Sequence, residues 1–361
     1  MLGLYKKTTV TIKHSFNFLI QVACKSYLMS SASIPIITAE ITLIKAVMKE
    51  IRIATRASKL ALAQANEIMK RLSSAAPDIP VSIVEISTKG DRDKSDFLYK
   101  ADSVGFFTSE VEQALLDGRA DVAVHSLKDL PTEITKGLAI SAIPQREQVN
   151  DVIVAAKAIT SVQDLSKWAT VGTSSVRRIS QLKLARPDLD CQPLRGNVET
   201  RINKIRSGEL DAIVVAQAGL NRLGMSDPIS LILPPEDFIP APGQGALAIQ
   251  TREDNTALCE LVHTLDDPSS RIATQTERRI LAALHGGCSI PLGVFCRIEK
   301  EIIYIQAILC NLAATKHIRK AVSCPLDKAS ETADYIVQQL LNEGGKEILD
   351  EVNNEKQGDF R

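Results

Sequence analysis

Residues 51–86 read IRIATRASKLALAQANEIMKRLSSAAPDIPVSIVEI and change their hydrophobic period twice. Residues 51–55 and 81–86 are short runs rich in β-branched side chains, as strands are. Between them, Ser58 stands where a helix N-cap is expected. The apolar residues that follow share one helical face: Ala61, Ala65, Ile68, Met69 and Leu72. A strand, a helix and a strand within about 35 residues predict a parallel βαβ unit and an α/β fold.

The same alternation continues outward from this unit. Further strands are predicted at residues 121–124, 139–143, 151–155, 211–216 and 246–250. Ser109 and Glu112 have the spacing of a capping box that starts a helix, and Asp117-Gly118 ends that helix. Another helix is expected from about Asn255. Residues 88–106 have no clear period, and a loop of that length is usually functional or mobile.

The pattern divides the chain into parts. We expect an extension at residues 1–49, a first α/β domain from residues 50–145 with 245–264, a second from 146–244, a third α+β domain at 265–351 and a polar tail at 352–361. Residues 144–150 and 240–245 would be the two crossovers between the first two domains. The predicted fold is therefore two periplasmic-binding-protein-like α/β domains with crossovers, plus a smaller α+β C-terminal domain that carries Cys288.

Composition excludes several classes of function. The 361 residues hold 43 Lys+Arg and 43 Asp+Glu, so no global charge favours nucleic acid. Aromatic residues make up only 4%, which argues against base-stacking surfaces. The 7 cysteines are widely spaced without a Cys-x-x-Cys, so neither a metal site nor a disulfide framework is expected. A reducing compartment, the cytoplasm, fits this cysteine usage best.

Residues 1–49 differ from the rest of the chain. The part before Glu40 holds four lysines and no acidic residue, and the apolar runs of the extension are too short to span a membrane. A basic, acid-poor start can be an organellar transit peptide, although no arginine precedes Arg52. The alternative is translation from Met48, since the core pattern begins just there.

Arginines recur where predicted strands pass into helices. A guanidinium group binds a carboxylate or phosphate through two hydrogen bonds, and helix N-termini favour anions. Any one of these arginines could be an ordinary surface ion pair. Together with neighbouring serines and threonines, they indicate a polycarboxylate ligand in a cleft between two α/β domains. The residues concerned are Arg56, Arg177, Arg178, Arg195 and Arg201.

Two further residues have chemistry at such positions. Asp129 follows the strand at 121–124, and Lys128 and His125 could hold it ionised while it accepts a proton; it could equally be a loop carboxylate before Pro131. Cys288 follows two glycines, which leave its sulfur unobstructed for covalent chemistry; it could equally be a small buried residue after a helix end.

Six motifs in one order resemble the porphobilinogen deaminase family (hydroxymethylbilane synthases) of haem biosynthesis. They are IATRAS at 53–58, HSLKD at 125–129, VGTSSVRR at 171–178, LRGN at 194–197, PGQG at 242–245 and GGC at 286–288. The resemblance covers about residues 51–350. It implies an enzyme that condenses four porphobilinogen molecules head to tail with release of ammonia, then hydrolyses off linear hydroxymethylbilane.

The resemblance also implies a cofactor and a set of site residues. A dipyrromethane group would be attached through a thioether to Cys288, the cofactor cysteine of the C-terminal domain. Asp129 would stabilise the positive charge that develops on the pyrrole nitrogen and take up the displaced proton, and Arg56 and Arg195 would assist catalysis. Cofactor contacts would come from Ser126, Lys128, Thr173, Ser174, Ser175, Arg177, Arg178, Arg195 and Gly196. Substrate contacts would come from Arg56, Ser58, Arg201, Gln244 and Lys100.

The loop at 88–106 departs from the family. Where relatives have Gly-Gly-Lys-Gly-Leu-Phe, this chain reads ADSVGFF at 101–107, with Val104 at the lysine position. Lys100 still matches a second lysine of that loop. The loss of one charge predicts weaker retention of the growing chain.

Two other functions remain open from the sequence. A non-catalytic solute-binding protein would share the two α/β domains, but it predicts export and gives Cys288 no role. A degenerate homologue kept for binding would explain Val104, but it does not explain why Asp129 and Cys288 are present. We expect no nucleic acid and no membrane as partners, and the family resemblance implies a monomer.

Overall fold

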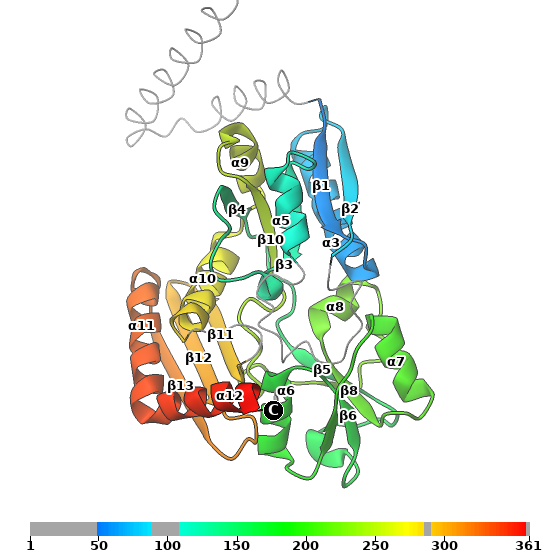
Figure 1. Cartoon of the computed structure of the whole chain (residues 1–361), viewed down its shortest axis with the longest axis vertical. Helices are drawn as coiled ribbons and strands as arrows, with labels where there is room; N and C mark the ends of the chain where they lie inside the picture. Colours follow the sequence, from blue (N-terminus) through cyan, green and yellow to red (C-terminus); the bar gives the residue numbers. More distant parts are fainter. Residues whose placement is uncertain (1–48, 89–107, 285–289, 359–361) are drawn as a thin grey trace, which may run out of the picture. The chain divides into compact units, whose positions relative to one another are not determined.

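The computed structural model describes residues 49–88, 108–284 and 290–358, and their strands form three sheets (Figure 1). The first sheet has the order β2-β1-β3-β10-β4. Its elements are β1 (Ile51–Arg56), β2 (Val81–Ile86), β3 (Val122–Ser126), β4 (Leu138–Ala142) and β10 (Leu247–Arg252), with helices α3 (Lys59–Ala75), α5 (Ser109–Leu116) and α9 (Thr256–His263). No helix in the described ranges is long and apolar enough to cross a membrane.

The βαβ unit forms as the sequence predicts. β1 and β2 pair in parallel over their whole length, from Ile51 with Val81 to Arg56 with Ile86. The hydroxyl oxygen of Ser58 caps α3 by accepting a hydrogen bond from the Ala61 backbone N at 3.2 Å. The predicted apolar face of α3 is buried except for Met69, which is half-buried.

The second sheet repeats the strand order of the first, as β7-β6-β8-β5-β9. Its elements are β5 (Asp151–Ala155), β6 (Thr170–Gly172), β7 (Asp190–Gln192), β8 (Ala212–Ala216) and β9 (Leu231–Ile232), with α6 (Val176–Ala185), α7 (Val198–Arg206) and α8 (Gln217–Arg222). In each sheet the fourth strand is antiparallel to the third, and the chain crosses between the sheets after β4 and again before β10. Two α/β domains joined by crossovers are therefore confirmed.

The third sheet is antiparallel and belongs to the C-terminal region. Its order is β11-β12-β13, from β11 (Leu292–Glu299), β12 (Ile302–Cys310) and β13 (His317–Pro325). Its helices are α10 (Pro268–Ala283), α11 (Ala329–Leu340) and α12 (Lys346–Gly358). Ile280 of α10, Val294 of β11 and Ile336 of α11 meet in one buried core. The smaller α+β C-terminal domain is thus also confirmed, while the domain boundaries stay a prediction.

Two local expectations are wrong. The N-cap of α5 is Thr108, which makes no capping hydrogen bond, and the Ser109 hydroxyl donates to Glu110 instead. Residues 352–358, expected as a polar tail, continue α12, because Ile348 and Val352 are fully or almost fully buried in the C-terminal core. Few apolar residues in this segment pack, so its helical pattern is weak in the sequence.

Candidate functional site

We call the domain built on the first sheet the first lobe and the domain built on the second sheet the second lobe. The first lobe has a pocket at the edge where β1 and β3 end. Arg56 is the last residue of β1 and Ser126 the last of β3, so the parallel strands bring them to one edge. The pocket has a volume of about 80 Å³. Gln64 of α3 donates from Nε2 to the Ser126 hydroxyl at 2.9 Å. The polar residues that line the pocket are Arg56, Ser58, Gln64, Thr108, His125, Ser126 and Asp129.

Asp129 lies on a single 3₁₀ turn, Leu127–Asp129, directly after β3. Asp129 is exposed and faces the pocket, whereas Leu127 beneath it is fully buried. Nζ of Lys128 donates to Oε1 of Gln244 at 3.3 Å. Burial, aided by the charge of Arg178, lowers the pKa of Lys128 to about 8, and Asp129 and Asp151 oppose this shift.

The turn is fastened from the C-terminal domain by Arg278 of α10. Its guanidinium donates to the carbonyls of Leu127 at 3.3 Å, Leu130 at 2.8 Å and Pro131 at 2.6 Å. Burial lowers the pKa of Arg278 to about 10. Arg278 therefore positions the segment that carries Asp129.

His125 does not support Asp129 by charge, contrary to expectation. Its Nε2 lies 3.1 Å from Oε1 of Gln250 on β10, and the ring is buried. Burial lowers the pKa of His125 to about 4, although the hydrogen bond to Gln250 opposes this shift. His125 is consequently neutral at physiological pH.

In the second lobe, the hydroxyl residues before α6 hold the loop in place. The Ser175 hydroxyl caps α6 by accepting from the Arg178 backbone N at 3.5 Å. Ser174 both donates to the Leu194 carbonyl at 3.0 Å and accepts from the Leu194 N at 2.9 Å. Thr173 accepts from the Ser175 N at 3.3 Å. These contacts join the loop after β6 to the loop after β7.

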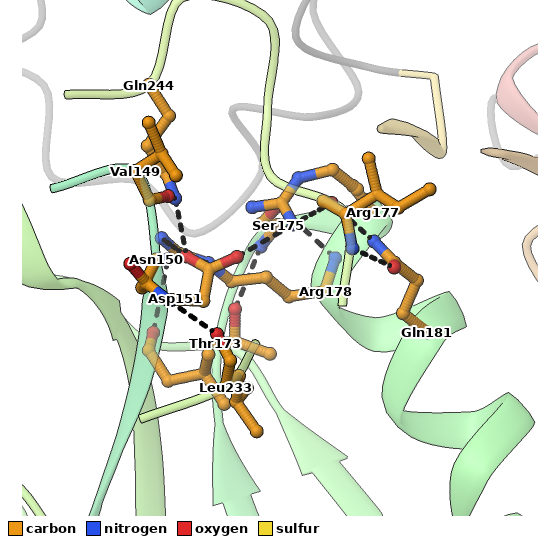
Figure 2. Close-up of polar contacts among 12 residues, drawn as sticks. Val149, Asn150, Asp151, Thr173, Ser175, Arg177, Arg178, Gln181, Leu233 and Gln244 are labelled. Atoms are coloured by element: carbon orange, nitrogen blue, oxygen red, sulfur yellow. Dashed lines mark hydrogen bonds and ion pairs between the residues drawn. The ribbon is translucent and has the colours of Figure 1, made fainter. Parts of the chain in front are cut away.

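Asp151 at the start of β5 is a site residue that the sequence analysis missed, and Figure 2 shows the side chains converging on it. Arg177 Nη1 lies 2.8 Å from its Oδ2, and Arg178 contacts its Oδ1 through Nε at 3.0 Å and Nη2 at 2.7 Å. Gln244 Nε2 donates to the same Oδ1 at 3.0 Å. Burial alone would raise the pKa of Asp151, but the two arginines outweigh it and lower this pKa.

One carboxylate does not neutralise two guanidinium groups, so this buried cluster retains positive charge. Nε of Arg177 has no hydrogen-bond partner among the described residues. Burial, with the charges of Arg178 and Arg195, lowers the pKa of Arg201 to about 10, and Asp129 opposes the shift. This coupling places four arginines, Lys128 and Asp129 in one electrostatic field. The arrangement can hold several carboxylates while leaving Asp129 to face a cation.

Arg195 lies in the turn between β7 and α7, and Arg201 lies near the start of α7. Gly196 has a φ of +102°, and a Cβ there would lie 2.9 Å from Thr200 Cγ2, so the turn favours glycine. Arg201 Nε donates to the Gly196 carbonyl at 2.8 Å. Within the described part of the chain, Arg195 makes no hydrogen bond or ion pair and is half-buried.

Gln244 connects the two groups of site residues. It is fully buried in the return to β10, where it accepts from Lys128 of the first lobe and donates to Asp151 of the second. The same return is held by Glu277 of α10, which accepts from Gly243 N at 2.7 Å and pairs with Arg146 at 2.8 Å. Lys100, Val104 and Cys288 lie outside the described residues.

Gln64, Asp151 and Arg278 were not singled out by the sequence. Asp151 contacts the site residue Arg178, which lies 27 residues along the chain. Arg278 contacts Leu127, in the turn that carries Asp129, 151 residues along the chain. Only the position of Asp151 at the first residue of a strand was a local signal, and a lone acid there is usually an exposed strand end.

Comparisons with known proteins agree on one family. Residues 51–260 match the family description "Porphobilinogen deaminase, dipyromethane cofactor binding domain", and residues 272–343 match "Porphobilinogen deaminase, C-terminal domain". The porphobilinogen deaminase of Maridesulfovibrio salexigens is 43% identical over 305 residues, which is 84% of this chain and 99% of that protein. The porphobilinogen deaminase of Legionella pneumophila strain Paris is 40% identical over 305 residues, which is 84% of this chain and 98% of that protein.

Solved structures give a weaker match. The periplasmic VFT2 domain of Bordetella pertussis BvgS aligns with a TM-score of 0.39 and 15% identity, over 63% of this chain and 91% of that one. The fold assignment therefore depends on the strand orders described above, and the family assignment on the two sequence comparisons. By both the family descriptions and these relatives, the chain belongs to the porphobilinogen deaminase family.

Proposed function

We propose that this protein is a porphobilinogen deaminase, which joins four porphobilinogen molecules head to tail, releases ammonia at each addition and hydrolyses off hydroxymethylbilane. The observation that carries this proposal is the exposed carboxylate of Asp129 in one electrostatic field with Lys128 and several arginines. Each porphobilinogen brings one acetate, one propionate and one aminomethyl group. The cationic side chains can bind the acetate and propionate groups, and Asp129 can stabilise the positive charge that develops in the reaction.

The second lobe fits a dipyrromethane cofactor, whose two rings carry several carboxylates. Nε of Arg177 and the guanidinium of Arg195 offer donors that no group in the described residues uses. Attached to Cys288 through a thioether, the cofactor would supply the pyrrole ring on which the chain is built. Its carboxylates would be held by Ser126, Lys128, Thr173, Ser174, Ser175, Arg177, Arg178, Arg195 and the backbone at Gly196.

The first lobe would hold the incoming porphobilinogen. Arg56 and Ser58 face the pocket together with Asp129, and Arg201 and Gln244 would contact the growing chain with Lys100. Asp129 would stabilise positive charge that develops on the pyrrole nitrogen and receive the displaced proton, while Arg56 and Arg195 steer each addition. An anion fixed where a cation develops lowers the barrier without reorganisation.

We also propose that the protein is a monomer of the cytoplasm. The described cysteines at 191, 259, 296, 310 and 324 are free, which suits a reducing compartment.

Turnover tests the proposed function directly. Purified protein given porphobilinogen should release ammonia and a linear tetrapyrrole that oxidises to a porphyrin. Asp129→Asn keeps the shape of the side chain but removes its charge, so we expect turnover to fall about a hundred- to a thousandfold. Asp129→Glu, the matched control, should retain more activity than Asn. Porphobilinogen consumption by the wild type without ammonia release would contradict the proposal.

A further inference from the structure

A buried polar chain crosses the first sheet behind the pocket. Thr135 Oγ1 donates to Glu112 Oε2 at 3.0 Å, and Gln250 Nε2 donates to Glu112 Oε1 at 2.8 Å. The other end of the Gln250 amide, Oε1, lies 3.1 Å from His125 Nε2. Gln250 and Glu112 are buried, and His125 forms part of the pocket wall. The chain therefore runs from the interior to the site.

This chain fixes the tautomer of His125. A carboxylate only accepts hydrogen bonds, so Glu112 must receive the amide NH₂ of Gln250. The amide oxygen is then the group that faces His125, and the hydrogen of the ring must be on Nε2. Nδ1 is left with its lone pair and with no partner among the described residues. The ring nitrogen that His125, a residue of the pocket wall, leaves unused is thus an acceptor and not a donor.

The sheet register holds the ring in this place. On the antiparallel pair β3 and β10, His125 lies opposite Ala248 and Ala123 lies opposite Gln250. His125 and Gln250 are therefore diagonal neighbours on one face of the sheet, within reach of long side chains. Burial keeps the ring neutral, because it lowers the pKa of His125 to about 4.

The pocket then has two kinds of groups for a small ligand. Arg56 and the Ser58 hydroxyl can donate to carboxylates. Asp129 is a charged acceptor, and Nδ1 of His125 is a neutral one. An ammonium group bound only by a carboxylate is stabilised as the ion and is held back from leaving as ammonia. A neutral acceptor can orient the same group with less stabilisation of the reactant.

We propose that Nδ1 of His125 accepts a hydrogen bond from the aminomethyl nitrogen of the incoming monopyrrole and orients this leaving group in the pocket, a role that rests on the proposed function. Asp129 then remains available for the pyrrole N–H. The Glu112–Gln250 pair is the positioning device, since it holds the ring through Nε2 and leaves the lone pair on Nδ1.

The test distinguishes binding of the aminomethyl group of the substrate from binding of its carboxylates. KM for porphobilinogen is compared with the inhibition constant of the pyrrole that carries the same acetate and propionate but no aminomethyl group. For His125→Phe, which keeps a ring but no acceptor, we expect KM to rise about ten- to a hundredfold with the inhibition constant changed less than about twofold. An equal rise in both constants would overturn the proposal.

Two polar variants identify the nitrogen that matters. His125→Asn places an amide oxygen near the position of Nδ1 and should restore KM to within a fewfold of the wild type. His125→Gln reaches toward the position of Nε2 instead and should not. Rescue by Gln but not by Asn would mean that the contact with Gln250 matters and that Nδ1 does not. This pair decides the question even if the Phe variant fails to fold.

The outcome is distinguishable from failure of the proposed function. If the wild type released no ammonia from porphobilinogen, the proposed function would fail in that sample, before any variant is compared. If the wild type is active and the His125 variants affect both monopyrroles alike, only the inference about His125 fails.

Discussion

The two α/β lobes have the same strand order but different charges at the same position. In each sheet the fourth strand begins opposite the last residue of the third: Leu247 pairs with Ser126 in the first lobe, and Asp151 pairs with Ala216 in the second. Leu247 leaves the first edge without a buried acid, so the carboxylate there is the exposed Asp129. Asp151 instead fixes two arginines inside the second edge.

This difference divides the work between the lobes. In the second lobe, the Asp151 carboxylate prearranges Arg177 and Arg178 and leaves a net positive charge, which under the proposed function would hold the cofactor. In the first lobe, a neutral His125 and Asp129 line a pocket, which under the proposed function would accept the substrate. The residue on the antiparallel strand would then decide which role each strand edge has.

Neutralising Asp151 should have the largest effect on the difference between the two lobes. Asp151→Asn would leave two buried guanidinium groups without a counter-charge, and we expect the free energy of unfolding to fall by about 3–5 kcal/mol. Urea denaturation of the purified protein measures this. The same change at exposed Asp129 is the matched control and should alter stability by about 0.5 kcal/mol or less. Equal effects at the two positions would remove the distinction between the lobes.

The pH dependence of stability tests whether His125 in the first lobe is buried and neutral. The pKa of His125 is lowered from 6.5 to about 4 in the folded protein, so the unfolded chain binds a proton more readily between these values. His125 then has no effect above pH 6.5, and the free energy of unfolding falls as pH drops from 6.5 toward 4, by up to about 3 kcal/mol. Urea denaturation at several pH values should show a flatter curve for His125→Asn. Parallel curves for the two proteins would contradict a buried, neutral His125.

Much of the fold followed from local patterns in the sequence. The βαβ unit at residues 51–86 has β-branched strands, a serine cap and a helical apolar face, and all three formed as expected. Arg56, Arg195 and the pair Arg177–Arg178 were expected at strand-to-helix transitions, and they lie there. Such positions are readable because they depend on neighbours within a few residues.

The rest of the site depends on contacts that no local pattern contains. Gln250 meets His125 from 125 residues away, and Arg278 reaches the Asp129 turn from another domain. Asp151 was recognised only as the start of a strand, since its two arginine partners come from a different element. The helical end of the chain was missed because two buried apolar residues, Ile348 and Val352, support it.

The intact mass of the purified protein is the decisive test for the covalent cofactor. We expect the chain mass plus two linked pyrroles and a positive reaction with Ehrlich's reagent. Both signals should disappear in Cys288→Ser. An unmodified chain mass in the wild type, unchanged after incubation with porphobilinogen, would show that no cofactor is attached and favour a protein that only binds carboxylates.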